Sequence, residues 1–108
     1  MSCDTKHHAN IYLFDIETTG LGPHCKIIEI CLHAVDRWSL EKCEANSQTP
    51  PRVVDKLALC VDPEMEISDK AEEMTGLSRE LLQCNQRGAF REGVAKLIKS
   101  FLEIHFDE

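Results

Sequence analysis

An abrupt change of hydrophobic periodicity, just past the middle of the chain, limits its fold more than any other feature of the sequence. Before Asp62-Pro63, three short segments are dominated by apolar and β-branched residues, which is typical of strands: Ile11–Ile16, Ile27–Val35 and Val53–Val61. Beyond that point, apolar residues recur at helical spacing. This order fits an α+β fold or the opening of a mixed α/β fold, in which a three-stranded meander is followed by helices that cover it.

Capping residues divide the second half of the chain into helices. Ser68 is a good N-cap and Gly76 a good terminator, which predicts a short helix between them. Ser78 can cap another helix that starts at the next residue. A third helix is expected over Phe90–Leu102, because its apolar residues lie on one stripe. The polar and proline-rich stretch Ser39–Arg52 predicts an exposed loop.

The size and charge of the chain exclude several classes of protein. Its 108 residues, 43% of them hydrophobic, suffice for one core. No apolar run approaches the roughly 20 residues of a membrane helix, and the polar N-terminus, residues 1–10, lacks the apolar core of a signal peptide. The formal charge of −7 argues against a broad cationic surface for nucleic acid, but an enzyme that engages phosphates through metal ions stays open.

The cysteines indicate the cellular compartment. Six of them lie at wide intervals in a chain without a secretory signal, and they form no C-x-x-C pair. We therefore expect reduced thiols, no structural zinc, and an intracellular protein of the cytoplasm, the nucleus or both.

Two acids in the most apolar strand are the most informative residues for function. Asp15 and Glu17 interrupt or end a segment that we expect to be covered on both faces. Residues two apart on a strand point to the same face roughly 6.6 Å from each other, so the two carboxylates can converge. Mg²⁺ or Mn²⁺ would suit such a pair and offset its repulsion. The alternative is that Glu17 sits at an exposed strand end while Asp15 pairs with Lys or Arg.

The residues around this pair match a known motif. The string Phe14-Asp15-Ile16-Glu17-Thr18-Thr19-Gly20-Leu21 resembles the first motif of the DEDDh 3′-to-5′ exonucleases. Two further segments, Pro51–Val61 and Met74–Ser78, are similar to the three-prime repair exonuclease (TREX) family, in the same order and at similar intervals. The resemblance runs from about Ile11 to Leu102 and covers only the N-terminal half of the family's catalytic domain.

This resemblance implies an enzyme that acts on DNA. It implies a ribonuclease H-like fold and two-metal hydrolysis of phosphodiester bonds at the 3′ ends of single-stranded or frayed DNA. Asp15 and Glu17 would be catalytic metal ligands, with magnesium as the ion and manganese as an alternative. Glu17 and Thr18 would also bind the terminal nucleotide. Leu21 with Met74 would form an apolar wedge against the last bases, the alternative being ordinary core packing.

The same resemblance marks residues 1–108 as a partial exonuclease domain that carries the first motif alone. Two more aspartates and a catalytic histidine belong to later motifs of the family, and His105-Phe106-Asp107 does not match their spacing. We therefore expect the chain to be inactive by itself, and marginally stable or self-associating, with its first strand exposing an edge.

Two expectations concern partners. The family implies homodimers that form through the third strand. The alternative to an enzyme is a non-catalytic short form that acts as a dimerisation or regulatory module, in which the third strand serves as the pairing edge.

Overall fold

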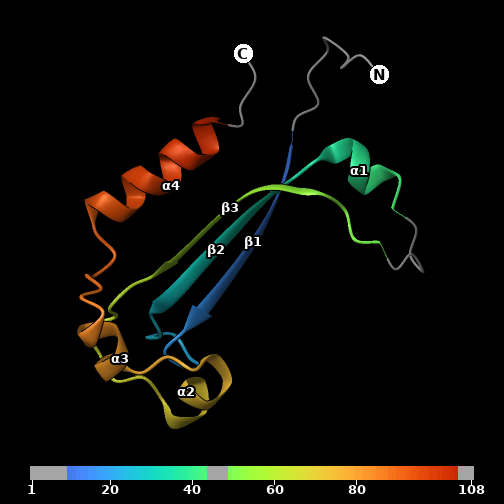
Figure 1. Ribbon diagram of the computed structural model, residues 1–108. Coiled ribbons are helices and arrows are strands. Elements are labelled where there is room, and N and C mark those ends of the chain that lie inside the picture. The colour runs from blue at the N-terminus through green and yellow to red at the C-terminus, as the bar shows by residue number, and fades with distance from the viewer. Residues whose placement is uncertain (1–9, 44–48, 105–108) are drawn as a thin grey trace.

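The computed structural model describes residues 10–43 and 49–104. Within them lie a three-stranded antiparallel sheet and the helices labelled in Figure 1. In chain order the elements are β1 (Ile11–Thr18), β2 (Ile27–Val35), α1 (Arg37–Glu41), β3 (Val53–Cys60), α2 (Asp69–Thr75), α3 (Arg79–Cys84) and α4 (Glu92–Ile104). Most of the polar N-terminus, residues 1–9, and His105-Phe106-Asp107 lie outside the described residues.

The sheet is a meander in which β2 lies between β1 and β3. Both pairs are antiparallel, with Cys31 of β2 opposite Asp15 of β1 on one side and Ala58 of β3 on the other. The predicted three strands followed by helices are confirmed, as is the exposed edge of β1. The predicted bounds of β2 are also confirmed, whereas β1 continues beyond Ile16 as far as Thr18.

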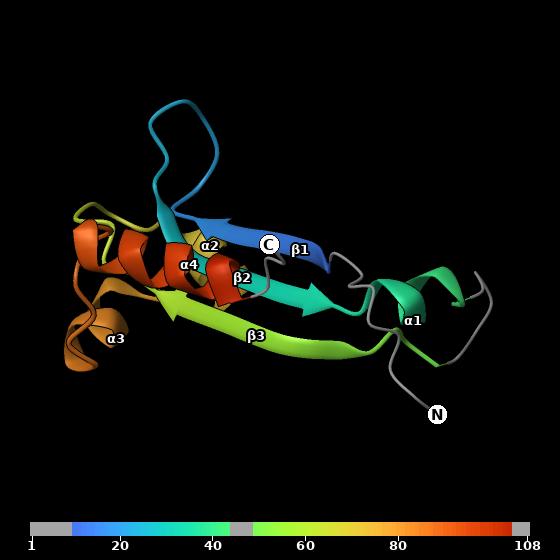
Figure 2. The same cartoon turned by 90° about the horizontal axis from the view of Figure 1, so that it is seen from above.

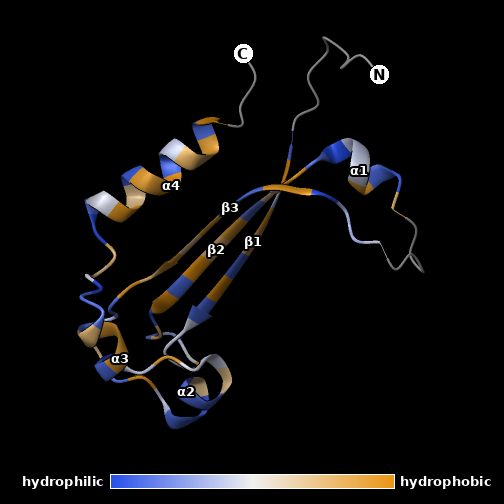
Figure 3. Ribbon diagram, viewed as in Figure 1, coloured by the Kyte–Doolittle hydropathy of each residue, from blue (hydrophilic) through white to orange (hydrophobic). Residues whose placement is uncertain are grey.

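One face of the sheet is covered by α4. Leu32 and Ala34 of β2 are buried against Phe101 of α4, and the Tyr12 hydroxyl donates to the Leu102 carbonyl over 3.2 Å. Figure 2 shows α4 lying along the sheet, and hydrophobic residues alternate with hydrophilic ones around this helix (Figure 3). The apolar stripe predicted from the sequence therefore packs on the sheet and leaves the other side of the helix to water.

At one end of the sheet, α2 and α3 lie next to the point where β1 stops and β2 starts (Figure 1). Ile28 of β2 is fully buried there against three apolar residues, Ile67, Ala71 and Leu82. The Ser68 hydroxyl accepts a hydrogen bond from the Ala71 N–H at 3.1 Å and so caps α2. Gly76 ends α2 with φ of 76°, a left-handed conformation that strains any residue with a Cβ. Both predicted caps are confirmed.

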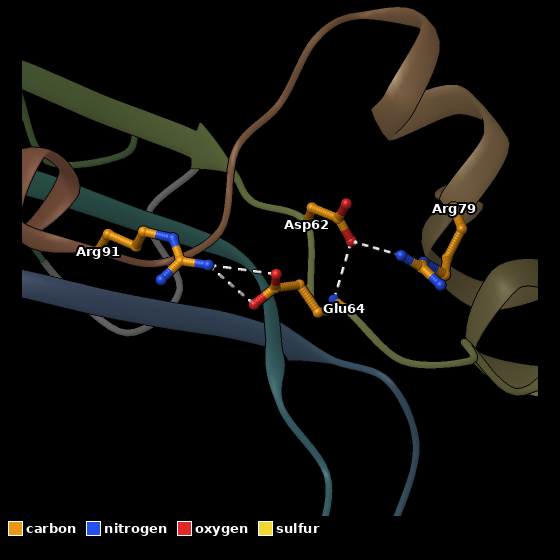
Figure 4. A network of polar contacts seen from close by, with 4 residues as sticks. All are labelled: Asp62, Glu64, Arg79 and Arg91. Carbon is orange, nitrogen blue, oxygen red and sulfur yellow. Dashed lines mark hydrogen bonds and ion pairs between the residues drawn. The ribbon is translucent and has the colours of Figure 1, made fainter.

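Two ion pairs connect the segment after β3 to the following helices (Figure 4). Arg79 at the start of α3 contacts Asp62 at 3.4 Å, and Arg91 just before α4 contacts Glu64 at 3.2 Å. The Glu64 N–H donates to the Asp62 carboxylate at 2.8 Å, so both pairs share one turn. Ion pairs near the surface contribute at most about 1 kcal/mol each. They connect one turn after β3 to the start of α3 and to the residue before α4.

The expectation that β1 is covered on both faces is wrong for the described chain. Leu13, Phe14 and Asp15 are exposed, and Phe14 keeps 60% of its accessible surface. The physical reason is the place of β1 at the edge of the sheet. In Figure 1, α4 follows one face, and no helix of the described residues runs along the opposite one.

Two other expectations need correction. The stretch Ser39–Arg52 is not wholly a loop, because α1 extends into it, capped by the Asp36 carboxylate that accepts from the Ser39 N–H at 2.9 Å. The last helix starts at Glu92 instead of Phe90. The Asp62 N–H donates to the Gly88 carbonyl at 2.9 Å, and this contact keeps the chain extended before α4.

The helices and cysteines of the described residues bear on the membrane and disulfide expectations. None of these helices combines the length and the apolarity that crossing a bilayer requires. Cys25, Cys31, Cys43, Cys60 and Cys84 are free thiols.

Candidate functional site

The two acids of the first motif lie on the same face of β1, near its C-terminal end. Glu17 is half-buried, whereas Asp15 is exposed. Across the strands, Asp15 is opposite Cys31 and Glu17 is opposite Glu29 of β2. Directly opposed residues share a face of an antiparallel sheet, so Glu29 adds a third carboxylate to this side. The face covered by α4 is the other one, which carries Tyr12.

No basic side chain of the described residues neutralises the two acids. Within residues 10–43 and 49–104, neither carboxylate takes part in a hydrogen bond or ion pair. The alternative that Asp15 pairs with Lys or Arg is therefore wrong for the described residues. The same residues contain no group of three or more His, Cys, Asp or Glu side chains placed to hold a metal ion. They offer two unpaired carboxylates on one face, which is an incomplete ligand set.

A hydrogen-bonded turn holds the end of β1 against α2. Thr19 is 3% exposed; its N–H donates to the Lys26 carbonyl at 2.9 Å, and its hydroxyl accepts from the Lys26 N–H at 3.1 Å. The Thr19 carbonyl accepts from the N–H of Ser68, the cap of α2, at 2.9 Å. The Thr18 hydroxyl donates to the Gly20 carbonyl at 2.8 Å. The Thr-Thr-Gly string thereby fixes the end of β1 relative to α2.

An open cavity of about 540 Å³ lies between the end of β1 and α2. It is lined by the four residues to which the resemblance assigned substrate binding, Glu17, Thr18, Leu21 and Met74. Ile16 and Lys70 line it as well. Asp15 does not line the cavity, although it shares a strand face with Glu17. The fold thus brings α2 next to the end of β1 and the turn that follows it, although α2 lies far from them in the sequence.

Leu21 and Met74 are not core residues in the described chain. Leu21 is fully exposed, and Met74 keeps 75% of its accessible surface. Ordinary core packing, the alternative considered for both, is therefore wrong here. Two large apolar side chains beside an open cavity are available to contact an apolar or aromatic ligand face.

Lys70 also belongs to this cavity, although the motifs of the sequence do not include it. It lies in the first turn of α2, four residues before Met74. Residues at this spacing project from the same side of a helix. Helical spacing from Met74 was therefore the signal that could have found Lys70 in the sequence.

Known proteins resemble this chain over most of its length. No protein-family model matches it. It is 42% identical over 100 residues to three-prime repair exonuclease 1 of Bos taurus, an alignment that covers 86% of this chain and 32% of the relative. It is 45% identical over 100 residues to three prime repair exonuclease 2 of Mus musculus, covering 87% of this chain and 42% of the relative.

The alignments cover less than half of each relative, so the similarity concerns only one part of these proteins. The chain spans between 32% and 42% of the length of the relatives compared. The matched part is their N-terminal part. The chain is thus homologous to the N-terminal part of the three-prime repair exonucleases, a family of nucleases.

Proposed function

We propose that this chain forms the part of a metal-dependent 3′-to-5′ DNA exonuclease that holds the substrate end and one side of the metal site. The reaction is hydrolysis of phosphodiester bonds at DNA 3′ ends, mainly single-stranded or frayed ones. The homology supports a nuclease. The observation that carries the finer proposal is the cavity between β1 and α2, where Glu17 and Thr18 lie beside the exposed Leu21 and Met74.

Asp15 and Glu17 are the proposed ligands of magnesium or manganese. Mg²⁺ is usually bound through one or two carboxylates together with waters and substrate phosphates, so two unpaired carboxylates on one strand face suit part of its ligand set. When bound, such ions stabilise the attacking and leaving oxygens of a phosphoryl transfer. The chain's own contribution is positioning, because β1 sets the spacing of the carboxylates and the turn sets the place of Thr18.

Leu21 and Met74 are the proposed contacts of the terminal bases. Their exposed side chains stand beside the cavity, Leu21 from the turn after β1 and Met74 from α2. Every base has an apolar face, so contacts of this kind are indifferent to sequence. That property suits an enzyme that removes nucleotides of any identity from an end.

Paramagnetic broadening tests the metal site in the chain itself. Substoichiometric Mn²⁺ should first broaden the amide signals around Asp15 and Glu17. The double variant Asp15→Asn with Glu17→Gln should lose this local broadening. Glu103→Gln, which removes an exposed acid of α4, should retain it. Equal broadening in the double variant would contradict the proposed ligands.

Digestion assays test the reaction. The chain should leave a 3′-labelled single-stranded oligonucleotide intact in magnesium, because the family's general base is not among its motifs and loss of such a base typically removes a factor of about 10²–10⁴. In a longer form that contains the later motifs, Asp15→Ala should abolish digestion without changing the circular dichroism spectrum. Mononucleotide release by the chain alone, or by the Asp15→Ala form, would contradict the proposal.

A second candidate function is a non-catalytic module that pairs with another chain. The observation in its favour is that β3 is an edge strand of the described sheet, with Val53 and Val54 exposed. An edge strand presents unpaired N–H and C=O groups to a further strand. This candidate predicts association through β3 with no localised Mn²⁺ broadening at β1. Localised broadening would instead favour the nuclease.

A further inference from the structure

We propose that Lys70 binds a phosphate of the DNA strand whose 3′ end enters the cavity between β1 and α2. The inference rests on the proposed function and adds to it a substrate-binding residue that lies outside the matched motifs. It follows from the place of Lys70, its lack of partners and the charge around it.

Lys70 is the one basic residue among the described residues that line this cavity. It is exposed, and its ammonium forms no hydrogen bond or ion pair with any of residues 10–43 and 49–104. Two other lysines differ, since Lys96 pairs with Glu92 at 3.5 Å and Lys42 lies 4.6 Å from the centre of the Trp38 ring. An unpaired ammonium keeps all three of its N–H donors for a ligand.

The backbone of Lys70 has a fixed place relative to β1, because α2 is anchored on both sides of it. The preceding helix cap, Ser68, donates its N–H to the Thr19 carbonyl at 2.9 Å. The following residue, Ala71, is buried in the cluster that contains Ile28. With Ser68 and Ala71 held in this way, the Lys70 side chain extends from a fixed point at the cavity wall.

The surrounding charges explain why a cation is needed at this wall. The chain carries a formal charge of −7. Glu17 lines the cavity, and Asp69 directly precedes Lys70 on α2. These acids repel a DNA phosphate. Metal ions held by β1 offset the repulsion on one side of the cavity only, and Lys70 offsets it on the side of α2. A phosphate contact positions the strand without reading its sequence, as a general exonuclease requires.

The salt dependence of DNA binding tests this inference in the chain itself. The probe is a short single-stranded oligonucleotide with a fluorophore at its 5′ end and phosphorothioate linkages at its 3′ end, measured by anisotropy at fixed magnesium and increasing potassium chloride. Lys70→Gln should reduce the slope of log affinity against log salt by about 0.7, the value for one phosphate contact on a single strand. Lys70→Arg should keep the wild-type slope.

The control is Lys99→Gln, which removes the same charge from the exposed side of α4. This variant should keep the wild-type slope. Equal slopes for Lys70→Gln and wild type, or equal losses in Lys70→Gln and Lys99→Gln, would overturn the role of Lys70 while leaving the proposed function standing. Failure of the wild-type chain to bind the oligonucleotide at any salt concentration would overturn both. Local Mn²⁺ broadening around Asp15 and Glu17 in the wild-type chain tests the proposed metal site and does not depend on Lys70. It therefore separates a failure of the proposed function from a failure of the role of Lys70.

Discussion

Cys60 shows how burial and a nearby carboxylate change the chemistry of one side chain. Burial raises the pKa of the Cys60 thiol, and the charge and hydrogen bond of Glu29 raise it further, against a smaller opposite effect of Arg87. The thiol donates to the Glu29 carboxylate at 3.9 Å. Because the fold favours the neutral thiol, the unfolded chain releases this proton at lower pH. The free energy of unfolding should therefore fall as pH rises through the ordinary range of thiol ionisation.

Alkylation measures this pKa difference residue by residue. At mildly alkaline pH, iodoacetamide should modify Cys60 more slowly than the exposed Cys25 and Cys84, and the difference should vanish in urea. Glu29→Gln should speed the reaction of Cys60, because it removes the negative charge that disfavours the thiolate. Glu103→Gln serves as the charge control, and mass spectrometry of the peptides gives the rates. An unchanged rate in Glu29→Gln would contradict the assigned cause.

The helix α2 begins at a side-chain cap, Ser68. Ser68→Ala removes the acceptor for the Ala71 N–H and should lower the free energy of unfolding by about 1 kcal/mol. Ser68→Asp should retain most of the stability, since a carboxylate caps equally well. Ser100→Ala, on the exposed side of α4, is the matched control and should be neutral. Urea titration followed by circular dichroism measures all three, and equal stability of Ser68→Ala and Ser100→Ala would contradict the capping role.

The docking of α4 depends on Phe101. Its ring is buried against Leu32 and Ala34, so Phe101→Ala should lower the free energy of unfolding by about 3–5 kcal/mol. Leu97→Ala is the control on the same helix, because Leu97 is exposed and should change stability by less than about 1 kcal/mol. Chemical denaturation measures both variants. A small effect of Phe101→Ala would show that α4 does not contribute its buried stripe to the core.

The elements differ in how far the sequence could predict them. Local sequence signals were sufficient to predict β2, which is rich in β-branched residues, and α2, which has a cap at each end. The start of α4 was misplaced because the contact of Asp62 with Gly88 is tertiary and leaves no local trace. The exposure of β1 likewise depends on what lies beside the strand. For the cavity, Leu21 and Met74 were found only through the family resemblance. Lys70 was missed because its spacing from Met74 becomes informative only once Met74 is known to face the cavity.

At the scale of the whole molecule, many large apolar side chains of the described residues are exposed to water. The described residues extend over 51 × 34 × 26 Å, with one face of the sheet covered by α4 and both β1 and β3 at its edges. On β1, the exposed apolar residues are Leu13, Phe14 and Ile16. An edge strand with exposed apolar side chains is a template for pairing with another chain.

This combination predicts self-association of the chain, which sedimentation velocity over a concentration series can measure. The sedimentation coefficient should rise with concentration, because association through β1 buries Phe14 and satisfies the unpaired backbone groups beside it. Phe14→Lys should shift the chain toward monomer, since a charged residue on an edge strand opposes strand pairing. Phe90→Lys is the control, because Phe90 is exposed to a similar degree but lies outside the sheet. If both variants associate like wild type, the contact is not formed by β1, and the edge of β3 becomes the surface to change next.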